Sequence, residues 1–167
     1  MFDAYIQYRP DEQIAIHEAA HAVVAIAKGG TVRKATIEPE ADTAGHVVVT
    51  GIEDSYGEAL CDLSAQVAVD RLACLRGGPA PDTEGSGRDF HNAAKSLASR
   101  MSWRTRDDEA IAWAGRCKRH ASVIVTVHWA EIESLADELL DRRSLDETDV
   151  RLYFQANHRD FYERFLK

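Results

Sequence analysis

The chain has 167 residues, 45% hydrophobic and 29% charged, which is typical of a globular protein, and we expect a single domain over residues 1–167. Its formal net charge of −8 argues against nucleic acid or an anionic membrane as the main partner, and no stretch approaches the roughly 18 apolar residues of a membrane span. The three cysteines lack Cys-x-x-Cys spacing and the first residues lack signal-peptide features, so the expected location is the cytoplasm.

Two helices and a hairpin are predicted in the first half of the chain. The first helix begins after Pro10 and ends before the Gly29-Gly30 pair. Two β-rich runs follow, Thr31–Glu38 and His46–Thr50, and their separation by a turn-rich stretch predicts a β-hairpin. The second helix extends from Ser55 to about Arg76, with Ser55 and Glu58 forming an expected capping box.

The second half of the chain is predicted to be helical after a loop rich in glycine and proline at residues 77–87. One helix is expected from Arg88 or Asp89 to about Trp103. The region 107–142 is again helical, with a break expected near Ala114-Gly115. A last helix near residues 146–155 leads into an aromatic and charged tail. The expected fold class is therefore mainly α, with a small β-hairpin or sheet after the first helix.

The strongest chemical motif lies within the first helix, where the run IAIHEAAHAVVAIA is apolar except for His17, Glu18 and His21. A helix that is apolar all round is buried, and polar groups on it need partners. Histidines four residues apart project from one face and can bind one ion, while a neighbouring glutamate can act on water. This is the His-Glu-x-x-His pattern of zinc peptidases. The alternative interpretation is a core helix whose histidines are satisfied by hydrogen bonds.

Catalytic zinc needs a third protein ligand, and the residue pattern alone leaves several carboxylates open. One group lies at or along the second predicted helix and the other lies in or just after the glycine-rich loop. Asp89 also has an ordinary role as an acidic residue near a helix N-terminus. The candidates are Glu53, Glu58, Asp62, Asp70, Asp82, Glu84 and Asp89.

The segment IHEAAHAVVA resembles the Ile-His-Glu-Ala-Gly-His-Ala signature of the FtsH-type AAA zinc metalloproteases. The similarity continues in order through TVRKATIEPEADTAGHVVVT, LSAQVAVDRLACLRGG, EGSGRDFHNAA and EIESLADELLDRRSLDETDV, and covers roughly residues 12–152. It is a resemblance to the peptidase domain standing alone, without the transmembrane anchor or the ATPase module. This sequence departs from the family pattern at Ala20, where glycine is usual, at Arg88, where asparagine is usual, and at Ala94, where threonine is usual.

The resemblance implies a set of roles for residues of this chain. It implies one zinc ion per chain, held by His17, His21 and Asp89, with Glu18 activating the water. Asp70 is then a supporting residue behind the ligands or an alternative ligand. A second group to stabilise the oxyanion stays unassigned; His46, His91, Tyr56 and Tyr153 are the candidates, each with an alternative structural or surface role.

The expected function is a zinc-dependent endopeptidase that hydrolyses flexible or unfolded polypeptides. The sequence has no Gly-Lys dipeptide and hence no P-loop, so a separate unfoldase or delivery partner would act on folded substrates. The strand residues Val47, Val48 and Val49 are the expected edge for an extended substrate, or they only cover the core. The alternative function is a regulatory or adaptor module that binds zinc without proteolysis. The sequence leaves the oligomeric state open.

Overall fold

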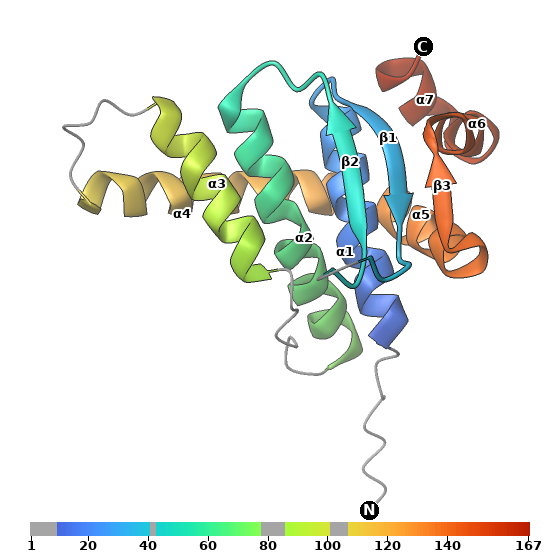
Figure 1. The fold of residues 1–167 in the computed structure, drawn as a ribbon, viewed down its shortest axis with the longest axis horizontal. Helices are drawn as coiled ribbons and strands as arrows, with labels where there is room; N and C mark the ends of the chain where they lie inside the picture. Colours follow the sequence, from blue (N-terminus) through green and yellow to red (C-terminus); the bar gives the residue numbers. More distant parts are fainter. Residues whose placement is uncertain (1–9, 41–42, 78–85, 101–106) are drawn as a thin grey trace, which may run out of the picture.

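The computed structural model describes residues 10–40, 43–77, 86–100 and 107–167 (Figure 1). Within them the chain is mainly helical with one small antiparallel sheet, as the sequence predicts. No helix in this part of the chain is long and apolar enough to cross a membrane. The elements in chain order are α1 (Pro10–Ala27), β1 (Thr31–Thr36), β2 (His46–Thr50), α2 (Ser55–Arg76), α3 (Ser86–Arg100), α4 (Asp107–Val127), α5 (Trp129–Arg142), β3 (Ser144–Asp146), α6 (Glu147–Asn157) and α7 (Arg159–Phe165).

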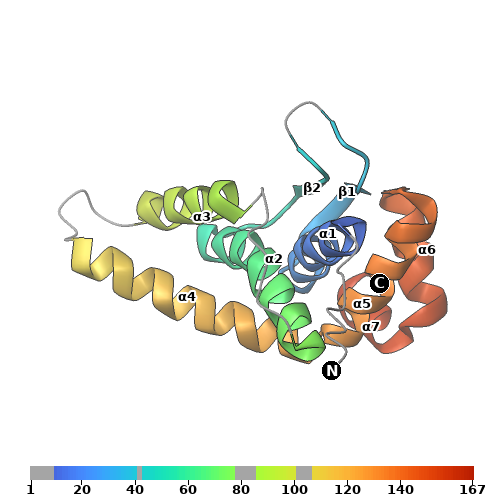
Figure 2. The same ribbon diagram turned by 90° about the horizontal axis from the view of Figure 1, so that it is seen from below.

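Helix α1 lies at the centre of the fold. It packs against α2 on one side, against α5 on another and against the sheet on a third, as Figure 2 shows. Its apolar residues between Ala15 and Ile26 are at most 3% exposed. The all-round apolar pattern of α1 therefore reflects burial on all sides, and the three polar residues of the motif are enclosed with it.

The sheet has three antiparallel strands in the order β2-β1-β3. The two strands of the predicted hairpin pair as expected, with an irregularity in register between Val32 and Lys34. Strand β3 was not predicted, because three residues carry no readable period-two pattern; it pairs with β1 through Ala35 and Leu145, both fully buried. Since β1 is the central strand, β2 forms an edge of the described sheet.

Helix α2 spans Ser55–Arg76 as predicted, but its capping residue and the break between α4 and α5 differ from the prediction. The side chain of Asp54, rather than Ser55, caps α2 and accepts a hydrogen bond from the Gly57 backbone nitrogen at 2.7 Å. Helix α4 continues through Gly115, and the break falls at His128. Cys117, Ala121 and Val125 form a fully buried stripe at helical spacing, and this packing outweighs the weak helix propensity of one glycine.

The start of α3 and the structure of the C-terminal tail also differ from the prediction. Helix α3 begins at Ser86, slightly earlier than expected, and the predicted end near Trp103 lies outside the described residues, as does most of the glycine-rich loop. The aromatic tail forms the short helix α7, whose Phe161 and Tyr162 are buried. Burial of these two aromatic side chains stabilises α7. A helix of this length shows too little periodicity to be predicted from the sequence.

Candidate metal centre

The three polar residues of the motif lie in α1 at the base of a cleft. His17 and Glu18 are only 6% and 5% exposed, and the His21 side chain is 12% exposed. Small alanine neighbours let α2 approach α1 closely at this point, since Ala19, Ala20 and Ala22 are all fully buried. The helix therefore presents two imidazoles on one face in an environment from which bulk water is largely removed.

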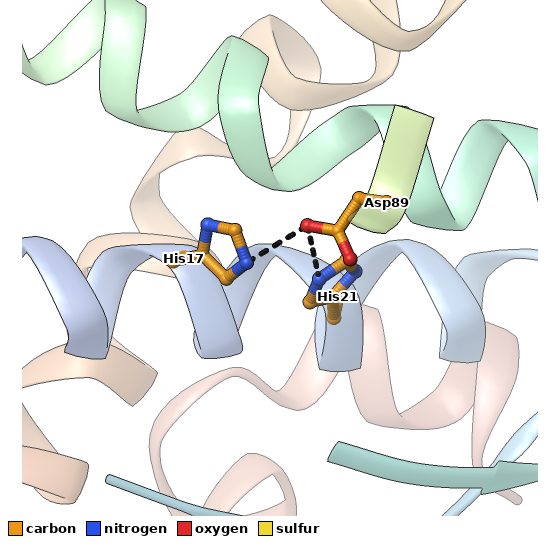
Figure 3. A group of neighbouring side chains, drawn as sticks. All are labelled: His17, His21 and Asp89. Atoms are coloured by element: carbon orange, nitrogen blue, oxygen red, sulfur yellow. Dashed lines mark ion pairs between the residues drawn. The ribbon is translucent and has the colours of Figure 1, made fainter. Parts of the chain in front are cut away.

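Asp89, in the first turn of α3, meets both histidines (Figure 3). Its Oδ2 atom lies 3.0 Å from His17 Nε2 and 3.5 Å from His21 Nε2. One ligand atom of each residue falls within 4.8 Å of the others, and no other group of this kind occurs among the described residues. We call His17, His21 and Asp89 the His-His-Asp group. Two nitrogens and one carboxylate oxygen are a ligand set that suits zinc and leaves a position open.

The three candidate ligand atoms of the His-His-Asp group lie close together around Asp89 Oδ2. Asp89 Oδ2 is buried and, in the part of the chain that the structure describes, has no hydrogen bond of proper geometry, although two ring nitrogens lie near it. A buried carboxylate oxygen without a partner is costly. A cation between the three atoms would remove that cost, so the residues present fit a bound metal ion.

The ring of His21 is oriented from behind by α2. Its Nδ1 lies 3.0 Å from the Cys61 carbonyl oxygen, which only accepts hydrogen bonds, so Nδ1 is the donor. The Cys61 thiol in turn donates to the His21 carbonyl at 3.3 Å, and the buried Ser64 hydroxyl donates to the Cys61 carbonyl at 2.6 Å. This directs Nε2 toward Asp89, as metal-ligating histidines require. The sequence offers no signal for a backbone acceptor on another helix.

The two histidines differ in their titration. Burial lowers the pKa of His17. Burial alone would also lower the pKa of His21, but its contacts with Asp89 and Cys61 outweigh burial and hold that pKa well above its usual value. Burial would raise the pKa of Asp89, yet the two imidazoles keep it well below its usual range. Asp89 is thus a carboxylate at neutral pH, the form that binds a metal ion.

Glu18 lies beside this group without belonging to it. Burial raises the pKa of its carboxyl group to about 7. Gly45, just before β2, closes over it: a Cβ atom at residue 45 would lie 3.0 Å from Glu18 Oε1 and 2.8 Å from the Thr36 carbonyl oxygen. The glycine therefore allows the backbone to pass directly over the Glu18 side chain.

A cleft of about 740 Å³ contains the His-His-Asp group and Glu18 in its walls. On the sheet side it is lined by residues of β2 and the segment before it, including Val47 and Val49, while Val48 is 43% exposed and is not among the lining residues. On the helical side it is lined by α2 and α3. An edge strand along an open cleft can accept an extended peptide by backbone pairing.

The other candidate carboxylates differ in whether they line the cleft that contains the His-His-Asp group. Glu58 and Asp62 line the cleft, and burial raises the pKa of Asp62 to about 6. Asp70 is not among the described residues that line it; the Gln66 amide donates to its Oδ1 at 2.7 Å, and Lys118 Nζ lies 3.8 Å from its Oδ2. Glu53 precedes α2 and does not line the cleft either. Asp82 and Glu84 lie outside the described residues.

Of the four candidate oxyanion donors, His46 lines the cleft, with its Nε2 3.3 Å from Glu40 Oε2. Tyr56 is hydrogen bonded to His120 at 3.2 Å, and the Tyr153 hydroxyl donates to the Ser134 carbonyl at 2.8 Å. His91 is exposed on α3. Among the residues the structure describes, then, His46 is the one of the four that faces the cleft.

Comparison of the chain with models of known protein families gives no match, and a search of curated proteins gives no match either.

Proposed function

We propose that this protein is a zinc-dependent endopeptidase related to the FtsH-type peptidase domains. The proposal rests mainly on one observation: Asp89, from helix α3, lies next to the Nε2 atoms of both motif histidines. Glu18 lines the same cleft beside them. A core helix with hydrogen-bonded histidines would not need the buried Asp89 Oδ2, which lacks a hydrogen bond among the described residues. The family resemblance supports the same interpretation.

In this proposal His17, His21 and Asp89 hold the metal ion. A zinc ion bound there would polarise the scissile carbonyl and make the attacking water more acidic. The carboxylate of Glu18 accepts the proton from that water and returns it to the departing amine. A pKa of about 7 suits both transfers, because the group can gain and lose a proton near neutral pH.

The proposed substrates are extended segments of flexible or unfolded polypeptides. The cleft has a volume of about 740 Å³, and the edge strand β2 contributes Val47 and Val49 to its lining. A peptide paired with this edge would be aligned by backbone hydrogen bonds. The 167-residue sequence contains no P-loop, so in this proposal folded substrates would need a separate unfoldase or delivery partner.

The proposal is tested by measuring the zinc content of the purified protein and its cleavage of casein and of a quenched-peptide mixture. We expect one zinc per chain, and we expect Glu18→Gln to keep the zinc while losing about a hundredfold or more of the activity. Glu133→Gln on the exposed face of α5 is the matched control and should change neither. Zinc without cleavage in any variant would favour the non-proteolytic zinc-binding module, and absence of zinc after reconstitution would refute both.

A further inference from the structure

The wall of the cleft formed by α3 carries a row of polar side chains next to Asp89. Arg88, Asn92, Lys95 and Ser96 all line the cleft, and their spacing of four, three and one residues places them on one face of a helix. We call these four residues the α3 row. It lies across the cleft from the apolar side chains of β2, so the two walls present different chemistry to a bound peptide.

The two cations of the α3 row are Arg88 and Lys95. Arg88 and Lys95 are both exposed, and neither makes an ion pair within the part of the chain that the structure describes. Arg33, Arg76 and Arg142 are each paired with a carboxylate, whereas Arg151 also forms no ion pair among the described residues. What distinguishes Arg88 and Lys95 is that they line the cleft. In a chain of net charge −8, unpaired cations inside a cleft are available to a ligand.

Two acidic residues of the opposing helix α2, Glu58 and Asp62, also line the cleft, but neither forms an ion pair with Arg88 or Lys95 among the described residues. Glu58 accepts a hydrogen bond from the Ser96 hydroxyl at 3.3 Å and forms no ion pair of 4 Å or less with Lys95. Asp62 is only partly exposed and lies next to the His-His-Asp group rather than at the outer rim. The exposed charged groups along the α3 wall itself are therefore positive.

We propose that the α3 row is a subsite for carboxylate groups of the bound polypeptide, either acidic side chains near the cleaved bond or a free C-terminus. This inference rests on the proposed function and adds a substrate class to it. Arg88 precedes Asp89 directly, so an arginine side chain of about 7 Å reaches groups within about two residues of the metal centre. Lys95 lies seven residues further, about 10 Å along the helix, or about three residues of an extended peptide.

Binding to a non-cleaving protein tests the subsite independently of catalysis. The zinc-loaded Glu18→Gln variant is titrated with fluorescent peptides of equal length that carry internal Asp/Glu, internal Lys/Arg, or neither, each with a free or an amidated C-terminus. We expect internal acidic residues or a free carboxylate to tighten binding by about fivefold, and added salt to weaken that preference. Comparison of the two C-terminal forms identifies which carboxylate is bound.

Charge reversal assigns the effect to the α3 row. Arg88→Glu and Lys95→Glu should each reduce the preference for acidic peptides, and together they should reverse it; the zinc content of each variant is measured because Arg88 adjoins Asp89. Arg151→Glu, on exposed α6, is the control and should leave the preference unchanged. Equal binding of all peptides, no binding of any, a preference for basic peptides, or a preference that survives the double reversal overturns the proposal. Selective binding by Glu18→Gln, together with no cleavage of any of these peptides by the zinc-loaded wild-type protein, would keep the subsite and refute the endopeptidase.

Discussion

Helices α1 and α3 both contribute to the candidate metal centre, but they are held in the fold in different ways. Helix α1 is enclosed by α2, α5 and the sheet, and most of its residues are inaccessible. Helix α3 packs on α2 and α4 at the edge of the molecule, and among residues 88–96 only Ala93 is buried. The two histidines therefore belong to the core, whereas Asp89 comes from the periphery.

This difference means that the histidines and Asp89 are held in position by different interactions. The histidine rings are positioned by packing and, for His21, by the Cys61 carbonyl, whether or not a ligand is present. Asp89 lies in the stretch 88–96 of α3, in which only Ala93 is buried, so we expect the position of its side chain to depend more on the charges that it meets in the cleft. Substitutions on α1 should therefore affect both zinc binding and stability, while substitutions on α3 should affect mainly zinc binding.

The largest effect is expected for His21→Ala. Zinc affinity should fall by more than about a hundredfold, because a ligand is lost. The metal-free protein should also lose about 2 kcal/mol of unfolding free energy, since the buried Cys61 carbonyl loses a donor and a cavity remains. Chelator competition and denaturant unfolding measure the two quantities. His91→Ala, exposed on α3, should alter neither, and unchanged zinc affinity in His21→Ala would exclude this residue as a ligand.

A smaller effect is expected for Asp89→Ala. Zinc affinity should fall by at least the tenfold to hundredfold that is typical even when a residue behind the ligands is lost. The metal-free protein should lose about 1 kcal/mol of unfolding free energy at neutral pH, less than His21→Ala, because Asp89→Ala removes the contact that lowers the pKa of Asp89 and raises that of His21 but leaves no large cavity in α1. The same two measurements apply. Asp70→Ala is the matched control: if it releases zinc while Asp89→Ala does not, the third ligand is wrongly assigned, and a large loss of stability in Asp89→Ala would contradict the contrast between the helices.

The smallest effect concerns pH. In the metal-free protein His21 has a raised pKa and His17 a lowered one, so at pH 7 His21 carries a proton that His17 lacks. Zinc must displace that one proton from His21 Nε2, so affinity should rise by about tenfold per pH unit below the pKa of His21. Calorimetry in buffers of different ionisation enthalpy counts the released protons. His158→Ala, remote on the C-terminal side, should not change the slope. Because Glu18 with its pKa of about 7 can also release a proton, the count is repeated in Glu18→Gln; release of two protons there would show that both histidines are charged.

Local patterns predicted those parts of the fold that depend on neighbouring residues. The bounds of α1, β2 and α2 follow from apolar runs and from glycines, and the structure agrees with them closely. The break between α4 and α5 and the strand β3 were mispredicted or missed. Both depend on packing against distant elements: the stripe at Cys117, Ala121 and Val125 carries α4 past Gly115, and β1 supplies the partner that makes residues 144–146 a strand.

The sequence by itself determined the group His17, Glu18 and His21, because residues four apart in one helix share a face whatever the rest of the chain does. Residue pattern alone left seven carboxylates open as partners, and only the resemblance preferred Asp89. The tertiary structure decided which carboxylate meets the imidazoles, that the Cys61 carbonyl orients His21, and that Gly45 covers Glu18. These contacts join α1 to α2, α3 and the strand edge, and no local periodicity encodes the distance between separate elements.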